Sequence, residues 1–281
     1  MDSEKWTTVI KPKTALWEID FKELIQYKDL WMMFVKRDII TQYKQTILGP
    51  LWFFINPIIT TAMYMIVFGG IAKIPTDGLP QPLFYLSGIC LWNYFSTCLL
   101  KTSTTFKDNE GIFGKVYFPR LVMPISTVTS NLYVFGIQLL LFTIVYLYYL
   151  LTGVNAAPNL YILLTPLLII MIAGLSLGFG IITSSLTTKY RDLSILFTFI
   201  VQIWMYATPI IYPLSMMSPQ KQWIAALNPV TSIVEAFRYA TLGTGTFDWG
   251  HLGYSFVFMC VVLGFGIVVF NKVQRSFMDT V

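Results

Sequence analysis

The chain has 281 residues, of which 56% are hydrophobic and only 12% are charged. Soluble domains normally contain about 25% charged residues, so this composition excludes a soluble protein and predicts an all-α protein that crosses a membrane several times. The formal net charge of +5 would indicate a nucleic-acid partner in a soluble chain. Here the distribution of the charges along the chain explains the excess, and no nucleic-acid partner is expected.

Residues 1–50 form the first predicted region, a cytoplasmic segment. They contain eight Lys or Arg and seven Asp or Glu residues, no apolar run long enough to span a membrane and no secretory signal. Between residues 21 and 48, the side chains Ile40, Tyr43 and Ile47 recur at helical spacing. This pattern predicts an amphipathic helix that lies in the membrane interface. The alternative is a solvated leader helix.

Residues 51–281 form a single predicted transmembrane domain. Residues 121–188 contain no charged residue and no histidine, and this stretch is long enough for two crossings and a turn between them. The second span carries Ser87 and Asn93, whose polar groups need partners in lipid, so it is expected to pack inward. Six spans are expected, at about residues 51–72, 82–100, 121–152, 160–187, 193–212 and 252–270.

The Lys and Arg residues predict the orientation of these spans. Sixteen of the 19 lie in the predicted inside segments, and only Lys73, Lys221 and Arg238 lie in the outside segments. Because Lys and Arg accumulate on the cytoplasmic side of a membrane, both termini are predicted to be cytoplasmic.

Residues 213–250 are predicted to hold two short helices before the last span. Ser218 and Asn228 each precede a proline, which combines a capping residue with the residue type favoured at the first helical position. The helices, at about 219–227 and 229–242, are too short to cross the membrane. They are predicted to form a re-entrant element that dips into the outer leaflet and returns. The alternative is an ordinary periplasmic loop.

The sequence offers little enzyme chemistry. Its only histidine is His251, so neither a Ser-His-Asp arrangement nor a metal cluster is expected from one chain. It contains no G-x-x-x-x-G-K-[ST] phosphate loop, and no acidic residue in a predicted span, which disfavours an ion-coupled carrier. We therefore expect a transport pathway with no metal and no cofactor of its own. A membrane acyl- or glycosyltransferase is the disfavoured alternative.

Aromatic residues in or near the spans suggest which class of substrate could pass through the transport pathway. Aromatic rings with a polar tip suit sugar rings, which can stack on them and form hydrogen bonds. The alternative is that these residues form interfacial belts or face lipid and neighbouring helices. The candidate path residues are Tyr64, Trp204, Tyr206 and Tyr212.

Five segments resemble those of polysaccharide-exporting ABC transporter permeases. The likeness covers nearly the whole chain in order. It is greatest to permeases that export O-antigen, with teichoic acid and capsule exporters as close relatives. The segments are residues 36–52, 114–121, 190–192, 208–213, and 227–229 with the downstream Glu235, Arg238 and Tyr239.

The resemblance implies a type-two ABC exporter fold and a homodimer with its pore at the dimer interface. It also implies two copies of a separate ATPase subunit, which would bind ATP and Mg²⁺ on the cytoplasmic side of the bacterial inner membrane. The cargo would be a lipid-linked polysaccharide. A same-fold exporter of teichoic acid, capsule, drugs or lipids is the alternative.

The resemblance also assigns roles to particular residues. The predicted contacts with the ATPase are Asn109, Glu110, Ile112, Phe113 and Lys115, together with Tyr190, Arg191 and Asp192 in the elbow before the fifth span. The predicted residues of the cytoplasmic entrance are Lys36, Arg37, Tyr43 and Lys44. The predicted residues of the periplasmic gate are Pro209, Pro213, Asn228, Pro229, Glu235 and Arg238. For the ATPase contacts, ordinary positive-inside anchoring is the alternative.

Glu235 and Arg238 are singled out by their spacing. They lie three residues apart on one face of a predicted helix, so they are expected to pair with each other. In a dimer they could instead pair with the partner chain. In either case they are assigned to holding the gate closed.

Overall fold

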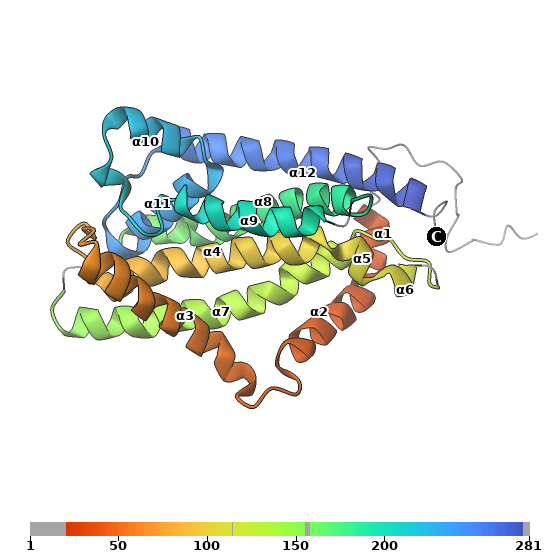
Figure 1. The fold of residues 1–281 in the computed structure, drawn as a ribbon, viewed down its shortest axis with the longest axis horizontal. Coiled ribbons are helices and arrows are strands. Elements are labelled where there is room, and N and C mark those ends of the chain that lie inside the picture. Colours follow the sequence, from red (N-terminus) through yellow and green to blue (C-terminus); the bar gives the residue numbers. More distant parts are fainter. Residues whose placement is uncertain (1–20, 114, 155–157, 191, 278–281) are drawn as a thin grey trace, which may run out of the picture.

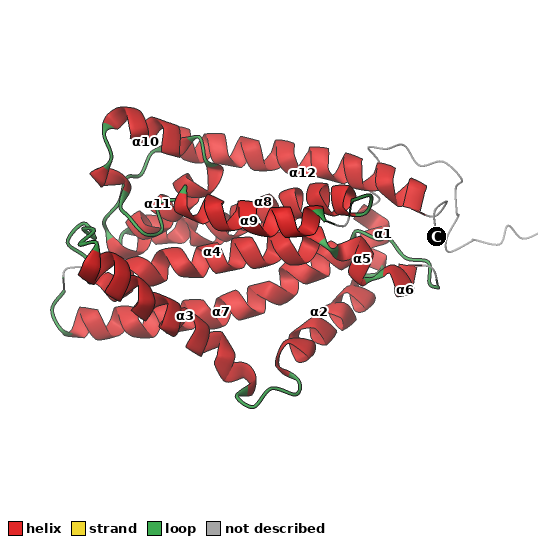
Figure 2. Cartoon of the chain, viewed as in Figure 1, coloured by secondary structure: helices red, strands yellow, loops and turns green. Residues whose placement is uncertain are grey.

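The computed structural model describes residues 21–113, 115–154, 158–190 and 192–277, and within these ranges every regular element is a helix (Figures 1 and 2). The longer helices run side by side along the long axis of the molecule, with α5 and α6 at one end and α10 at the other. The described residues therefore have the predicted all-α class.

The elements follow one another with short connections. In chain order they are α1 (Phe21–Gln26), α2 (Lys28–Tyr43), η1 (Gly49–Leu51), α3 (Trp52–Tyr64), η2 (Met65–Ile71), α4 (Gln81–Ser103), α5 (Thr105–Asp108), α6 (Glu110–Phe113), α7 (Val122–Leu151), η3 (Leu160–Leu164), α8 (Thr165–Thr187), α9 (Leu193–Tyr206), η4 (Leu214–Met216), α10 (Pro219–Ala226), α11 (Pro229–Leu242) and α12 (Trp249–Phe277).

Five of the predicted spans coincide with helices that are long and apolar enough to cross a membrane. They are Gly49–Ile71, Gln81–Ser103, Val122–Leu151, Leu160–Thr187 and Trp249–Gln274. The first joins η1, α3 and the π-helical η2 into one continuous helical segment.

The remaining prediction, a span over residues 193–212, differs from the structure. Helix α9 ends at Tyr206 after 14 residues, which corresponds to about 21 Å against a hydrocarbon core of about 30 Å. The chain then turns, because Pro209 cannot donate a backbone hydrogen bond and restricts the residue before it. α9 is thus a shorter apolar helix than the other five.

Helix α4 lies at the centre of the bundle. Over its most apolar 18 residues, 78% are buried, against 11–28% in the other four spans. It packs against α3, α7, α8, α9 and α11, and Leu83, Tyr85, Leu91 and Phe95 are fully enclosed. The prediction that the second span packs inward is therefore confirmed.

Helices α8 and α12 pack through glycine. A Cβ added to Gly266 would lie 2.9 Å from the carbonyl oxygen of Gly178, and a Cβ on Gly178 would lie 3.0 Å from the backbone nitrogen of Leu263. Such distances are too short for any larger side chain without movement of the backbone. Small residues at these two positions allow the close backbone approach typical of membrane helices.

The N-terminal helices pack against one end of the bundle. The predicted helix over residues 21–48 is divided into α1 and α2 and ends at Tyr43. α2 contacts α7 and buries Phe34 and Val35, whereas Ile47 of the predicted apolar stripe lies fully exposed beyond the helix. The predicted helix is therefore present in two pieces, and its contact with the bundle is made by Phe34, which packs on Phe118. The location of this helix in the membrane interface stays a prediction.

Helices α10 and α11 form as predicted but have different surroundings. Asn228 caps α11 by accepting a hydrogen bond from the backbone N–H of Val230, and Gly243 ends the helix with φ of 71°. Ser218 begins α10 without a side-chain capping bond. Most of α11 is buried against α4, α8 and α12, whereas α10 leaves Trp223 exposed.

The two ends of the bundle carry different segments. α5, α6 and the C-terminal end of α12 lie at one end, and α10 lies at the opposite end (Figure 1). Lys107 on α5 and Lys272 on α12 therefore belong to elements at one end, whereas the loop that contains Lys73 and helix α10, which contains Lys221, lie at the other.

Candidate functional site

A buried ion pair lies on α11. The guanidinium Nη1 of Arg238 is 3.3 Å from Oε1 of Glu235, and the two side chains are 2% and 3% exposed. The expected pairing between these residues is therefore present within one chain. Burial of two charges is costly unless both are paired and hydrogen bonded, so their other contacts decide what the pair does.

Arg238 joins α11 to two other parts of the bundle. Its Nη2 donates to the carbonyl oxygen of Ile210 at 2.9 Å, its Nη1 to that of Pro209, and its Nε to Ser87 Oγ at 3.2 Å. The guanidinium also stacks over the ring of Phe84, 3.9 Å from the centroid. One side chain thus fastens α4 and the turn that follows α9 to α11.

The absence of a side chain at Gly88 leaves space for the guanidinium of Arg238 and for Ile210. A Cβ at this position would lie 2.8 Å from Nη2 of Arg238 and 3.0 Å from Cγ2 of Ile210. Any larger residue at Gly88 would displace the guanidinium or the turn after α9.

Glu235 fastens the segment that follows α11. Its Oε2 accepts a hydrogen bond from the backbone N–H of Thr246 at 3.0 Å and another from the Thr246 hydroxyl at 3.3 Å. Both charged groups are therefore satisfied within the chain.

Asn228 connects the end of α9 with the start of α11. Its Oδ1 accepts from the indole Nε1 of Trp204 at 3.1 Å, and its Nδ2 donates to Thr208 Oγ1 at 2.9 Å. The hydrogen-bonded set is called the Arg238 network below; it consists of Ser87, Trp204, Thr208, Pro209, Ile210, Asn228, Glu235, Arg238 and Thr246.

The structure brings together four of the six predicted gate residues in the Arg238 network, namely Pro209, Asn228, Glu235 and Arg238. The other two, Pro213 and Pro229, are buried. Sequence reasoning missed Ser87, Gly88 and Thr246. Ser87 was noted only as a polar group needing a partner, and nothing local in the sequence names Arg238 as that partner.

The predicted path residues divide into packed and exposed ones. Trp204 meets Phe95 and Phe179 edge to face, at centroid distances of 5.2 and 5.1 Å. Tyr64 packs on Tyr85 and donates its hydroxyl to Met205 Sδ at 3.2 Å.

The other two path residues are Tyr206, the last residue of α9, and Tyr212 in the turn that follows it. Tyr206 is 58% exposed, and its carbonyl oxygen accepts a hydrogen bond from the hydroxyl of Tyr212 at 3.1 Å. Trp204 and Tyr64 therefore contribute to packing, and Tyr206 is the most exposed of these four rings.

The predicted coupling segment is divided between inward and outward side chains. It forms α5 and α6 with a break at Asn109, whose side chain donates to the carbonyl oxygen of Thr105. Phe113 is only 3% exposed and packs between Phe106 and Phe118. Glu110 and Lys115 are exposed, and Ile112 is half-buried.

The predicted elbow and entrance residues lie mostly at the surface. Tyr190 is 53% exposed, with the Lys189 ammonium 5.3 Å from its ring centroid, and Asp192 is exposed. Arg191 lies outside the described residues. On and just after α2, Lys36, Arg37 and Lys44 are exposed and Tyr43 is half-buried.

Comparison with known proteins identifies the family. A family model described as ABC-2 type transporter matches residues 29–242. The chain belongs to the ABC-2 type transporter family. The matched residues run from α2 to α11, so they include the segment of α5 and α6 and every residue of the Arg238 network except Thr246.

Individual members of the ABC-2 family align over most of the chain. The O-antigen export system permease protein RfbA of Myxococcus xanthus is 28% identical, covering 77% of this chain and 82% of its own. The protein of the same name from Klebsiella pneumoniae is 26% identical, covering 89% and 94%. The polysialic acid transport protein KpsM of Escherichia coli is 26% identical, covering 87% and 93%. Over the described residues, no group of three or more His, Cys, Asp or Glu residues could hold a metal ion.

Proposed function

We propose that this chain is the membrane-spanning subunit of an exporter that moves lipid-linked, O-antigen-like polysaccharide across the bacterial inner membrane. The observation that carries the proposal is the alignment, over most of both chains, with permeases named for O-antigen export and polysialic acid transport. The names of these three relatives contain two different glycans, O-antigen and polysialic acid, which favours long surface polysaccharides as the cargo class over a small drug.

A separate ATPase supplies the energy in this proposal. The chain contains no phosphate-binding loop motif, so ATP and Mg²⁺ would be bound by the partner, two copies of which dock on the end of the bundle that carries α5 and α6. The exposed Glu110 and Lys115 would contact the ATPase. The buried Phe113 would fix the position of α6 through its contacts with Phe106 and Phe118. Glu110→Ala should lower export per ATP hydrolysed without affecting membrane insertion.

A second copy of the chain completes the pore in this proposal. α9 exposes Ile195, Phe199 and Ile203, and only 11% of the most apolar part of Gly49–Ile71 is buried. These apolar faces support a dimer interface formed by α3 and α9, with Tyr206 beside it. In the dimer, α9 and the turn after it would act as the sixth crossing.

The Lys- and Arg-rich end of the bundle supports a cytoplasmic location of both termini. The burial of α11 against α4, α8 and α12 supports a re-entrant element, and the Arg238 network would hold its outer end closed between transport cycles.

Deletion of the gene tests the proposal. The mutant should lose surface polysaccharide and accumulate lipid-linked polymer in the cytoplasm. A strain carrying a hydrolysis-deficient partner ATPase is the matched control and should show the same phenotype. Normal surface polysaccharide in the deletion strain would contradict the proposal. Accumulation of teichoic acid, capsule or a lipid would identify the alternative cargo.

A further inference from the structure

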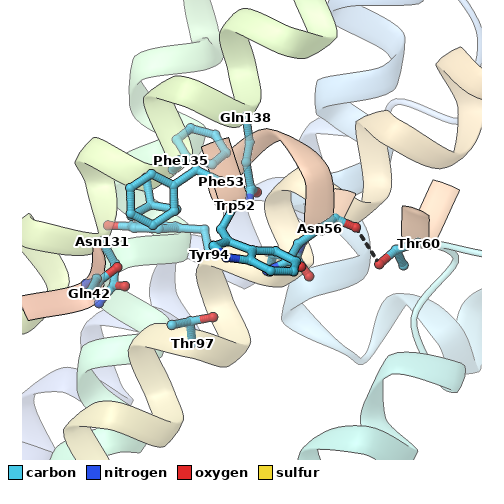
Figure 3. Close-up of a pocket in the computed structure, with 12 residues that line it drawn as sticks. Gln42, Trp52, Phe53, Asn56, Thr60, Tyr94, Thr97, Asn131, Phe135 and Gln138 are labelled. Atoms are coloured by element: carbon cyan, nitrogen blue, oxygen red, sulfur yellow. Dashed lines mark hydrogen bonds between the residues drawn. The ribbon is translucent and has the colours of Figure 1, made fainter. Parts of the chain in front are cut away.

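A polar cavity of about 310 Å³ lies between α3, α4 and α7, beside the C-terminal end of α2 (Figure 3). Its walls include the amide side chains of Asn56, Asn93 and Gln138 and the aromatic rings of Trp52 and Tyr94. It shares no residue with the Arg238 network. Its volume falls at the lower end of the range of about 300–1,000 Å³ that is usual for small-ligand sites.

Gln138 is a buried polar group without a partner. It is only 7% exposed, and its Oε1 has no hydrogen-bond partner in the described structure. Figure 3 shows its side chain extending from α7 into the cavity. A buried acceptor without a donor lowers stability, so the cavity retains a hydrogen-bonding group that only a bound molecule or water can satisfy.

The chemistry of the walls is neutral. None of the lining residues is charged, so a phosphate or carboxylate in the cavity would lack a counter-charge. The ammonium of Lys101 donates to Asn131 Oδ1 at 3.2 Å and is thus paired with a lining residue, although Lys101 itself does not line the cavity. Amides provide both donors and acceptors, and aromatic rings provide apolar faces.

We propose that this cavity binds a neutral sugar residue of the exported glycan. Hydroxyl groups of a sugar can satisfy Gln138 and the asparagine amides, and its apolar ring face can pack against Trp52 or Tyr94. This inference rests on the proposed function and adds a binding site within each subunit.

The position of the cavity fits an early step of transport. Gln42 contributes to its wall from α2, immediately before the predicted entrance residues Tyr43 and Lys44. A sugar bound here would hold the glycan beside α3, the least buried of the five spans. Because all the recognition is neutral, binding is weak enough to release the residue again.

Photolabelling tests the site directly. The permease, purified with its ATPase, is exposed to octyl glucoside that carries a diazirine in the alkyl chain, and the labelled peptides are mapped by mass spectrometry. The glucoside should label α3 and α7 at the cavity, and probes with the same tail but a phosphocholine or phosphate head should not. Equal labelling by the phosphocholine probe would indicate a lipid site, and stronger labelling by the phosphate probe an anion site; either result would overturn the proposal.

Gln138→Leu provides the decisive variant. Loss of one neutral hydrogen bond should weaken glucoside binding about five-fold, while removal of the unsatisfied oxygen should maintain or raise thermal stability. A purely structural role predicts the opposite pattern, with lower stability and unchanged labelling.

Thr143→Val is the matched control, because Thr143 is an exposed residue of the same helix, α7, whose hydroxyl donates to the Leu139 carbonyl oxygen and which does not line the cavity. It should bind the probe like the unaltered protein. Absence of specific labelling in a permease that exports polysaccharide would overturn the sugar site alone. If the purified protein is labelled specifically but deletion of its gene leaves surface polysaccharide intact, the sugar site is supported and the proposed cargo is contradicted.

Discussion

The Arg238 network and the cavity beside α3 are two polar regions of one apolar bundle, and they differ in how their polar groups are used. Around Arg238, the charged groups find partners inside the chain, including Glu235, Ser87 and two carbonyl oxygens. In the cavity, Gln138 retains an acceptor without a partner. Polar groups that are internally satisfied hold helices together, whereas unsatisfied groups around an open volume are typical of ligand binding.

The largest expected effect is that of Arg238→Ala. It leaves the carboxylate of Glu235 buried without its cation, which should destabilise the protein by about 3–5 kcal/mol and increase leakage of small solutes. Thermal unfolding in detergent and solute efflux from vesicles measure the two effects. Lys221→Ala, at an exposed position on α10, is the control and should change neither.

Two double variants sharpen this result. Glu235→Gln with Arg238→Gln should recover part of the lost stability, because no unpaired charge remains. Exchange of the two charges should not recover it, because a carboxylate at position 238 would face the carbonyl oxygens of Pro209 and Ile210. Full rescue by the exchange would show that the pair, rather than its wider contacts, holds α11.

Gly88→Ala should have the next largest effect. Its Cβ would clash with Arg238 and Ile210, and overpacking of this kind costs about 1–3 kcal/mol. Gly136→Ala on α7 is the matched control, since a Cβ there meets no atom within 4 Å. Equal melting temperatures for the two variants would contradict a tight fit around the guanidinium.

Asn228→Ala should be milder. It removes the cap of α11 and the bonds to Trp204 and Thr208, and loss of a cap typically costs about 1 kcal/mol. Ser218→Ala is its counterpart at α10, where the side chain makes no capping bond, and it should change the melting temperature less. The reverse order would mean that the capping contacts of Asn228 are energetically unimportant.

The smallest effect on stability is expected in the cavity. Asn93→Leu should change the free energy of unfolding by less than about 0.5 kcal/mol and yet lower the rate of polysaccharide export. Export assays and thermal unfolding of the same preparation test both parts. A large loss of stability with normal export would mean that the cavity residues hold helices together, as the Arg238 network does, and do not bind a ligand.

Local features of the sequence predicted local features of the structure. Apolar runs free of charge located five spans, the Asn-Pro pair located the start of α11, and the spacing of Glu235 and Arg238 predicted their contact. Contacts between distant residues were beyond sequence reasoning, because Ser87 and Arg238 are 151 positions apart. The inward direction of the Phe113 side chain was likewise not evident from the sequence, since a single helical turn can place a side chain on either side.

The cavity illustrates the same limit. Its amide residues are contributed one or two at a time by four different helices, and each alone reads as an isolated polar residue in a membrane helix. Likewise, the length of α9 could have been inferred from the prolines at 209 and 213, but the hydrophobicity that continues to Tyr212 concealed the end of the helix.

The glycine contact between α8 and α12 has a mechanical consequence. Where the backbones of the two helices touch, at Gly178 and Gly266, no side chain lies between them that could be rearranged to let one helix slide past the other. We expect α8 and α12 to keep a fixed position relative to each other, while α3, which belongs to the least buried span, moves relative to them. Spin labels on α8 and α12 should therefore keep one distance through the ATP cycle, while a label on α3 changes its distance from both.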